Sequence, residues 1–246
     1  MNPQELLRAG KLNEAIQALG AEVRESPADL KRRTFLFELL CFAGEYDRAA
    51  KQLNILAQAG SDAETGALLY RSALAAERKR QVFFEDREYG NRGVAPASPP
   101  GSINGRAFQT LEDADPRIGP RLELFVAGEY LWLPFEHIGA VRIEPPRLLR
   151  DLLWATGEII SGPAANGREF GEVLLPALYP FSSRHSSEAV RLGRATDWQT
   201  RDDSEVPFGQ KLLVVDGEEV IPFLEVRELS FNAPELAQEI DRSASA

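Results

Sequence analysis

The chain has 246 residues, of which 43% are hydrophobic and 9% aromatic, and its net charge is −10. This apolar content is enough to build ordinary cores, so the composition excludes a disordered chain, and the length suggests two modest domains. Residues 1 to 94 hold 14 basic and 14 acidic residues, whereas residues 95 to 246 hold 14 and 24. An acidic second half disfavours nucleic-acid binding, which requires a basic face.

The N-terminal segment carries charges throughout and lacks the apolar stretch of a secretory signal. No later apolar run approaches the ~20 residues that a membrane-spanning helix needs. The single cysteine, Cys41, has no second cysteine for a disulfide or a metal cluster, which fits a reducing compartment. We therefore expect a cytoplasmic protein without membrane contact, with Cys41 as a small buried side chain on a helix.

The first half contains an internal repeat. The segment AGKLNEAI at 9 to 16 is similar to AGEYDRAA at 43 to 50, and the offset is 34 residues, the tetratricopeptide period. The glycine of each segment permits a tight turn between helices, and Pro27 stands where the next helix of such a repeat begins. Residues 1 to 88 are thus predicted to form tetratricopeptide-like helical hairpins.

The apolar spacing and the capping residues predict five helices in this region. Their expected ranges are 3 to 9, 11 to 25, 28 to 43, 45 to 59 and 62 to 85.

Stacked helical hairpins present a concave surface that is lined by the first helix of each repeat and receives peptides. The repeat register places seven residues on this partner-binding surface: Lys31, Thr34, Glu38, Phe42, Thr65, Leu68 and Ser72. Among them Phe42 is the predicted anchor, because aromatic side chains are enriched at interface hot spots. The alternative for each position is ordinary solvent-facing helix surface.

Residues 89 to 105 contain four glycines and three prolines, so we predict a linker or a long loop there. From residue 106 to 246, short apolar runs alternate with turn signals at strand spacing. Pairs of runs flank Gly128 with Glu129, and Asp216 with Gly217, as in tight hairpins.

The acidic second half is therefore predicted to be a strongly bent antiparallel sheet or a small barrel. We expect at most short helices near residues 147 to 154 and 234 to 241. With the helical first half, the fold class is mixed α+β.

Four stretches resemble the signature of the ImpE/TagJ family. They are YLWLPFEHIGAVRIEPPRLLRDLLW at 130 to 154, GEVLLPALYP at 171 to 180, RLGRATDW at 191 to 198 and LLVVDGEEVIPFLEVREL at 212 to 229. With the repeat-like first half, the resemblance spans nearly the whole chain. Residues 95 to 105 and the acidic segment 202 to 205 match no signature, and no role is assigned to them.

This resemblance implies a non-enzymatic cytoplasmic adaptor of the type VI secretion system. The expected partner is the N-terminal helix of the small subunit of the contractile sheath, and the expected role is to assist sheath assembly or recycling. An indirect connection with the sheath-recycling ATPase is also implied.

Charged residues inside the signature stretches have structural explanations. Arg150 and Asp151 precede one tryptophan, and Arg194 and Asp197 precede another. Such charges beside apolar runs commonly pair with each other or satisfy the backbone of turns. The alternative is a recognition surface, since arginine and tryptophan are enriched at interfaces.

A small serine-type hydrolase with a helical lid is the alternative function. Ser183, His185 and Asp197 supply the residue types of a catalytic triad, but the serine lacks a G-x-S-x-G elbow. His137 and His185 have no further ligands at metal-binding spacing, and no glycine-rich phosphate loop occurs. We expect no catalytic residues, cofactor or metal, and convergence of the three triad residues in a water-excluding site would favour the hydrolase.

Overall fold

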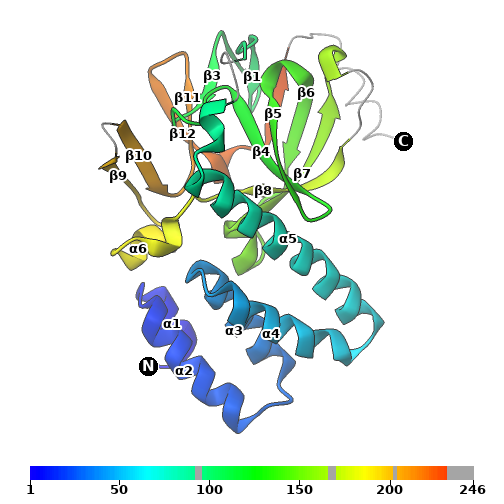
Figure 1. The fold of residues 1–246 in the computed structure, drawn as a ribbon, viewed down its shortest axis with the longest axis vertical. Helices are drawn as coiled ribbons and strands as arrows, with labels where there is room; N and C mark the ends of the chain where they lie inside the picture. The colour runs from blue at the N-terminus through cyan, green and yellow to red at the C-terminus, as the bar shows by residue number, and fades with distance from the viewer. Residues whose placement is uncertain (92–95, 166–169, 202–203, 232–246) are drawn as a thin grey trace.

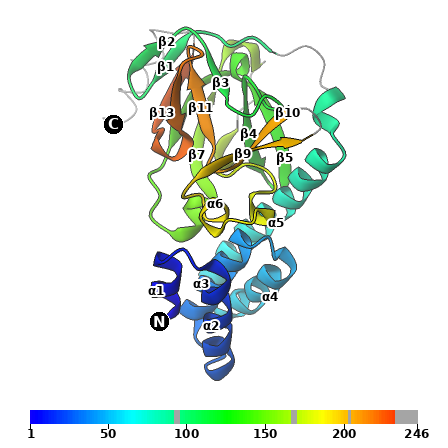
Figure 2. The same cartoon turned by 90° about the vertical axis from the view of Figure 1, so that its left-hand side faces the viewer.

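The structure, a computed structural model, describes residues 1–91, 96–165, 170–201 and 204–231. Five α-helices make up the N-terminal half: α1 (Pro3–Arg8), α2 (Leu12–Glu25), α3 (Leu30–Phe42), α4 (Tyr46–Leu56) and α5 (Ser61–Glu85). Their limits lie within three residues of the predicted ones, and a short 3₁₀ turn, η1 (Ala57–Ala59), continues α4. Helices α1 to α4 lie at one end of the molecule, and the long α5 runs from them to the sheets (Figures 1 and 2).

The helix ends follow from local chemistry. Asn2 and Glu5 form a capping box at α1, in which each side chain accepts the backbone N–H of the other at 2.9 Å. Asp29 caps α3 by accepting a backbone N–H of the first turn at 3.0 Å. The glycines of the two repeat segments, Gly10 and Gly44, adopt φ values of +79° and +70° and turn the chain between paired helices, as predicted.

The described residues of the second half form three antiparallel sheets. The largest has the order β2-β1-β13-β6-β7-β8-β4-β5. Its strands are β1 (Gly101–Ile103), β2 (Arg106–Phe108), β4 (Arg121–Val126), β5 (Glu129–Pro134), β6 (Ile138–Ile143), β7 (Trp154–Ser161), β8 (Gly171–Pro176) and β13 (Glu228–Phe231). The others are β12 (Glu219–Pro222), β11 (Leu212–Val215) and β3 (Leu111–Asp113) in one sheet, and β10 (Ser204–Gly209) with β9 (Thr196–Arg201) in the other.

Of the two forms predicted for the second half, a strongly bent sheet or a small barrel, the closed barrel is wrong. Within the described ranges, the end strands β2 and β5 of the large sheet do not pair with one another, so this sheet is open. The strand-rich character and the antiparallel pairing are confirmed, which gives a mixed α+β fold.

Details of the connections also differ from expectation. The turn between β4 and β5 is formed by Ala127 and Gly128, with φ values of 49° and 83°, one residue before the predicted pair. The turn at Asp216 and Gly217 is confirmed. The predicted linker contains the strand β1, which pairs with β13.

Of the two short helices expected in the second half, the first is the 3₁₀ turn η4 (Leu149–Leu152), and the second lies outside the described residues. A further short helix, α6 (Glu188–Arg191), packs near β10. No helix in the described ranges combines the length and apolarity needed to cross a membrane.

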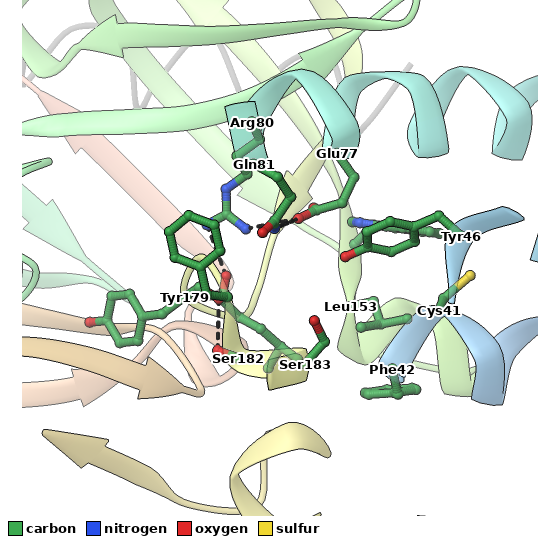
Figure 3. A pocket seen from close by; sticks show the side chains of 13 residues that line it. Cys41, Phe42, Tyr46, Glu77, Arg80, Gln81, Leu153, Tyr179, Ser182 and Ser183 are labelled. Atoms are coloured by element: carbon green, nitrogen blue, oxygen red, sulfur yellow. Dashed lines mark hydrogen bonds and ion pairs between the residues drawn. The ribbon is translucent and has the colours of Figure 1, made fainter. Parts of the chain in front are cut away.

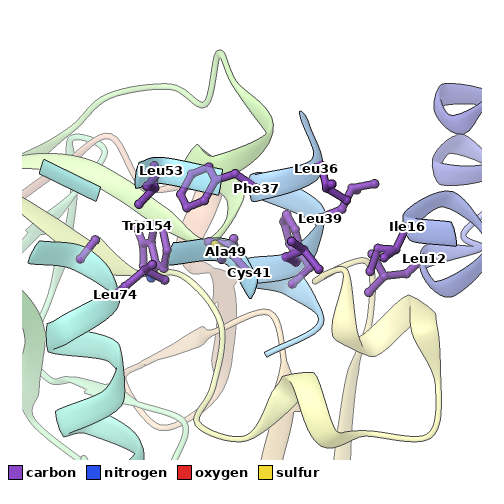
Figure 4. Packing of buried hydrophobic residues seen from close by; sticks show 14 of the residues in the cluster. Leu12, Ile16, Leu36, Phe37, Leu39, Cys41, Ala49, Leu53, Leu74 and Trp154 are labelled. Atoms are coloured by element: carbon purple, nitrogen blue, oxygen red, sulfur yellow. The ribbon is translucent and has the colours of Figure 1, made fainter. Parts of the chain in front are cut away.

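One apolar core joins the helices to the large sheet (Figure 4). The buried cluster includes Leu12, Leu36 and Leu74 of the helices together with Trp154 of β7 and Leu174 of β8. The core therefore crosses the predicted boundary between the halves. Cys41 belongs to this cluster and is 2% exposed, as expected for a small buried side chain.

Candidate functional site

An apolar hollow of about 160 Å³ opens between α3, α4 and α5. Its lining residues are Thr34, Phe37, Leu53, Leu56, Ala63, Gly66, Ala67, Tyr70 and Arg150. Three of the four α5 residues in the wall, Ala63, Gly66 and Ala67, are small, and a Cβ added to Gly66 would meet no atom within 4 Å. Small side chains on one helix face keep this space open between otherwise packed helices.

Arg150 enters this hollow from the strand-rich half, on η4. Its Nη1 donates to Glu38 Oε1 of α3 at 2.7 Å, and its Nε donates to the hydroxyl of Tyr70 on α5 at 2.5 Å. The guanidinium carbon lies 4.8 Å from the centre of the Tyr70 ring, which itself stacks on Trp154. Arg150 therefore links two helices that flank the hollow to the large sheet.

The electrostatics of this link reflect its burial. Burial raises the pKa of Glu38, and the hydrogen bond from Arg150 opposes this effect. Asp151 does not join the pair, because its Oδ2 accepts the backbone N–H groups of Arg147 and Leu148, each at 2.8 Å. The side chains of Arg150 and Asp151 therefore both form hydrogen bonds within the fold, as the sequence indicated.

The structure separates the seven predicted partner-binding residues. Lys31, Thr65 and Leu68 are exposed, Thr34 and Ser72 are half-buried, and Glu38 and Phe42 are buried. Thr34 lines the hollow, whereas Ser72 lines a smaller one of about 70 Å³ beside the β4–β5 turn.

Phe42 is 1% exposed and cannot contact an incoming partner, so its predicted role as the anchor is corrected. The strand-rich half covers the C-terminal part of α3, where every residue from 36 to 42 is buried. Only the N-terminal part of α3 remains open to a partner. The repeat register could not reveal this, because it assumes a helical stack with a free concave face.

A further, smaller hollow lies where α3, α4 and α5 meet the chain after β8 (Figure 3). Tyr46, Glu77 and Gln81 are among its walls, and Gln81 donates to Glu77 at 2.6 Å. Its volume of about 30 Å³ is enough for one or two water molecules but not for a substrate or a peptide. Burial raises the pKa of the Cys41 thiol at its edge, which disfavours the reactive thiolate.

The three candidate triad residues do not converge. His185 Nε2 lies 2.9 Å from Asp197 Oδ2, while its Nδ1 accepts the backbone N–H of Ser187 at 3.0 Å. Both ring nitrogens are therefore engaged, and the hydroxyl of Ser183 hydrogen-bonds to Tyr46 instead. The hydrogen bond with His185 lowers the pKa of Asp197. Among the contacts of the described residues, none joins the His185 ring to Ser183, as activation of a nucleophile would require.

Metal-binding side chains are also dispersed. Across the ranges that the structure describes, no three His, Cys, Asp or Glu residues are grouped so that they could hold a metal ion.

Charged side chains that the sequence analysis missed are buried where α5 crosses the sheet. Glu123 of β4 accepts hydrogen bonds from Arg80 at 2.8 and 2.9 Å and from Lys211 at 2.6 Å. Lys211 also lies 2.6 Å from Asp113, and the hydroxyl of Tyr130 donates to Glu123 at 2.5 Å. These mutual contacts leave no opening for a ligand, so this buried charge cluster fixes α5 on the sheet.

The loop after α6 fastens the N-terminal hairpin in a similar way. Arg194 donates from Nη1 to the carbonyl of Arg8 at 3.0 Å and from Nη2 to that of Leu7 at 2.7 Å. The backbone N–H of Asn13 donates to Glu188 at 2.8 Å. Arg194 of one signature stretch and Glu188 of α6 therefore hold α1 and α2 against the strand-rich half.

Known proteins share this arrangement. The crystal structure of a protein from Vibrio parahaemolyticus superposes with a TM-score of 0.82 at 24% identity, and the match covers 95% of this chain and 99% of that one. This likeness concerns the fold.

Sequence similarity goes further. A relative from Pseudomonas aeruginosa, named type VI secretion system accessory component TagJ, is 35% identical over 264 aligned residues. The alignment covers 94% of this chain and 91% of the relative. The family described as ImpE protein matches residues 105–230. The chain belongs to the ImpE family, as the signature stretches in its second half indicated.

Proposed function

We propose that this protein is a non-enzymatic, cytoplasmic accessory component of type VI secretion that works as an adaptor. The similarity to the Pseudomonas aeruginosa relative, which is named as a type VI secretion system accessory component, supports a role in this system. The open apolar hollow between α3, α4 and α5 is the single observation that supports peptide binding as its mode of action.

The proposed occupant is an amphipathic helix, the N-terminal helix of the small subunit of the contractile sheath. A hollow walled by three helices can bury one apolar stripe of an incoming helix. The half-buried Leu56 and Tyr70 supply apolar contacts, with the buried Phe37 beneath them. The exposed Lys31 of α3 and Thr65 of α5 would set the orientation of the helix. Binding there would assist sheath assembly or recycling and connect the protein indirectly with the recycling ATPase.

The test uses isothermal calorimetry with the intact protein and a synthetic peptide of that helix. Gly66→Phe places a ring in the hollow, and we expect it to weaken binding about thirtyfold or more, since loss of a central anchor costs about 2 kcal/mol. Gly66→Ala is the matched control, because one methyl group in open space leaves the hollow accessible.

The two parts of the proposal can fail separately. Unchanged binding by Gly66→Phe, with a normal melting temperature, would refute the hollow as the site. Absence of binding by the unmodified protein would refute the partner.

A further inference from the structure

Arg150 is the one charged side chain among the nine residues that line the hollow. A guanidinium has five N–H donors and no acceptor. Glu38 and Tyr70 engage Nη1 and Nε. The Glu38 side chain that balances its charge lies deeper, 8% exposed against 20% for Arg150, and does not line the hollow. An occupant therefore meets hydrogen-bond donors and positive charge there.

This chemistry restricts what can dock. A purely apolar helix would remove water from the N–H groups of Arg150 that Glu38 and Tyr70 do not engage, and it would offer no acceptor in its place. Its affinity should be roughly tenfold or more below that of a helix that supplies an acceptor. A carboxylate would accept charge-assisted hydrogen bonds in the planar geometry that a guanidinium offers.

The Arg150 guanidinium is also held in place before any occupant binds. Contacts with α3 through Glu38 and with α5 through Tyr70 fix it, and the ring of Tyr70 lies beside it at 4.8 Å. A side chain that is already ordered loses little entropy when it binds, which strengthens its discrimination between occupants.

We propose that Arg150 is the specificity-determining residue of the hollow. It selects an amphipathic helix that carries an aspartate or glutamate beside its apolar stripe. The inference rests on the proposed function, because it concerns the same site. Since Arg150 comes from the strand-rich half and the apolar walls from the helices, recognition requires both halves.

The test is a double-mutant cycle with the full-length protein. The probes are the peptide of the sheath small subunit's N-terminal helix and a series in which each acidic residue is singly replaced by its amide. We expect one of these replacements to weaken binding to the unmodified protein about tenfold. The Arg150→Gln variant should bind the original peptide and that replaced peptide with the same affinity. Arg150→Lys should keep only part of the preference, because an ammonium lacks the planar fork.

Two controls separate recognition from folding. Arg150→Gln leaves Glu38 buried without its partner, so the double variant Glu38→Gln/Arg150→Gln, which removes both charges, should show the same loss of acid preference. Glu38→Gln alone keeps Arg150 and should keep the preference.

The outcomes distinguish the two proposals. If the unmodified protein binds the peptide and Gly66→Phe blocks binding, but no acidic position depends on Arg150, this inference fails and the proposed function stands. If the unmodified protein does not bind the peptide, both fail.

Discussion

Arg80 of α5 and Glu123 of β4 form a bidentate ion pair, with Nε and Nη2 donating to the two carboxylate oxygens at 2.8 and 2.9 Å. The side chains are 2% and 0% exposed. Lys211 approaches the same carboxylate at 2.6 Å, so one buried anion pairs with cations from two segments far apart in the chain. This pair joins the helical half to the sheet at a position that water does not reach.

Removing the anion should therefore be costly. We expect Glu123→Gln to lower the free energy of unfolding by about 3–5 kcal/mol, because the buried Arg80 would lose its bidentate partner and the buried Lys211 would keep only one of its two carboxylates, Asp113. Urea denaturation measures this loss. The control is Glu129→Gln, which removes the exposed ion pair with Lys79 and should cost about 1 kcal/mol or less. Equal losses in the two variants would contradict the prediction.

The same cluster predicts a pH dependence through Asp113. Burial raises its pKa from the usual 3.8 to about 6, although Lys211 opposes the shift. Between about pH 4 and pH 6 the folded state therefore binds this proton more tightly than the unfolded chain. The stability that Asp113 contributes is present below pH 4 and is lost as the pH rises through 6.

Glu123 acts in the opposite sense. Its burial would raise the pKa, but Arg80 and Lys211 outweigh this and lower the pKa to about 2, so its contribution is lost as the pH falls below 4.5.

Denaturation at pH 4, 5, 6 and 7 should show the difference in stability between the unmodified protein and Asp113→Asn decreasing with pH. A difference that stays constant would show that Asp113 does not titrate in this range.

Gly44 should resist substitution for two separable reasons. Its φ of +70° disfavours any side chain, and an added Cβ would lie 2.6 Å from Oγ of Ser183. We expect Gly44→Ala to cost about 2 kcal/mol or more in thermal or chemical denaturation. Gly10→Ala is the matched control, since the backbone strain is similar and the nearest atom is 3.6 Å away.

Ser183→Gly in the Gly44→Ala background should recover only the part of the loss that comes from the close contact. If Gly10→Ala proves as costly as Gly44→Ala, backbone strain alone explains the effect.

Arg194 should stabilise the first helix. Its guanidinium donates to the carbonyls of Leu7 and Arg8 at the end of α1, and the Leu7 carbonyl also accepts the backbone N–H of Gly10 at 2.9 Å. We expect Arg194→Ala to cost about 1 kcal/mol and to accelerate amide hydrogen exchange in α1 and the start of α2. Arg194→Lys should restore part of the protection, because a cation still suits a helix C-terminus. Unchanged exchange in α1 would rule out this role.

The helices were predictable because their signals are local. The 34-residue spacing and the apolar period place α1 to α5 to within three residues, although α3 begins at Leu30 behind Asp29 and not at Pro27. The β4–β5 turn was misplaced by one residue because Ala127 adopts a positive φ that its side chain gives no reason to expect. β1 was missed because a short strand in a segment rich in glycine and proline exists only through its pairing with β13.

The hollow was partly predictable. Thr34 lines it and Lys31 lies exposed on the same helix, as the repeat register indicated. Phe42 and Glu38 follow the same register, but the strand-rich half covers them, which is a tertiary effect. Arg150 belongs to no repeat and reaches the hollow from η4. The sequence therefore singled it out only as a charged residue that precedes a tryptophan.

The sheet order also constrains when this protein can fold during synthesis. β13 lies between β1 and β6, and Gly101 pairs with Phe231, which the ribosome adds 130 residues later. Helices α1 to α4 contact sequence neighbours and can pair as soon as they emerge, whereas one edge of β6 must wait for the last described strand. At about 5–20 residues per second, the nascent chain presents that unpaired edge for roughly 5 to 20 s, a window in which a ribosome-associated chaperone can protect it from other chains.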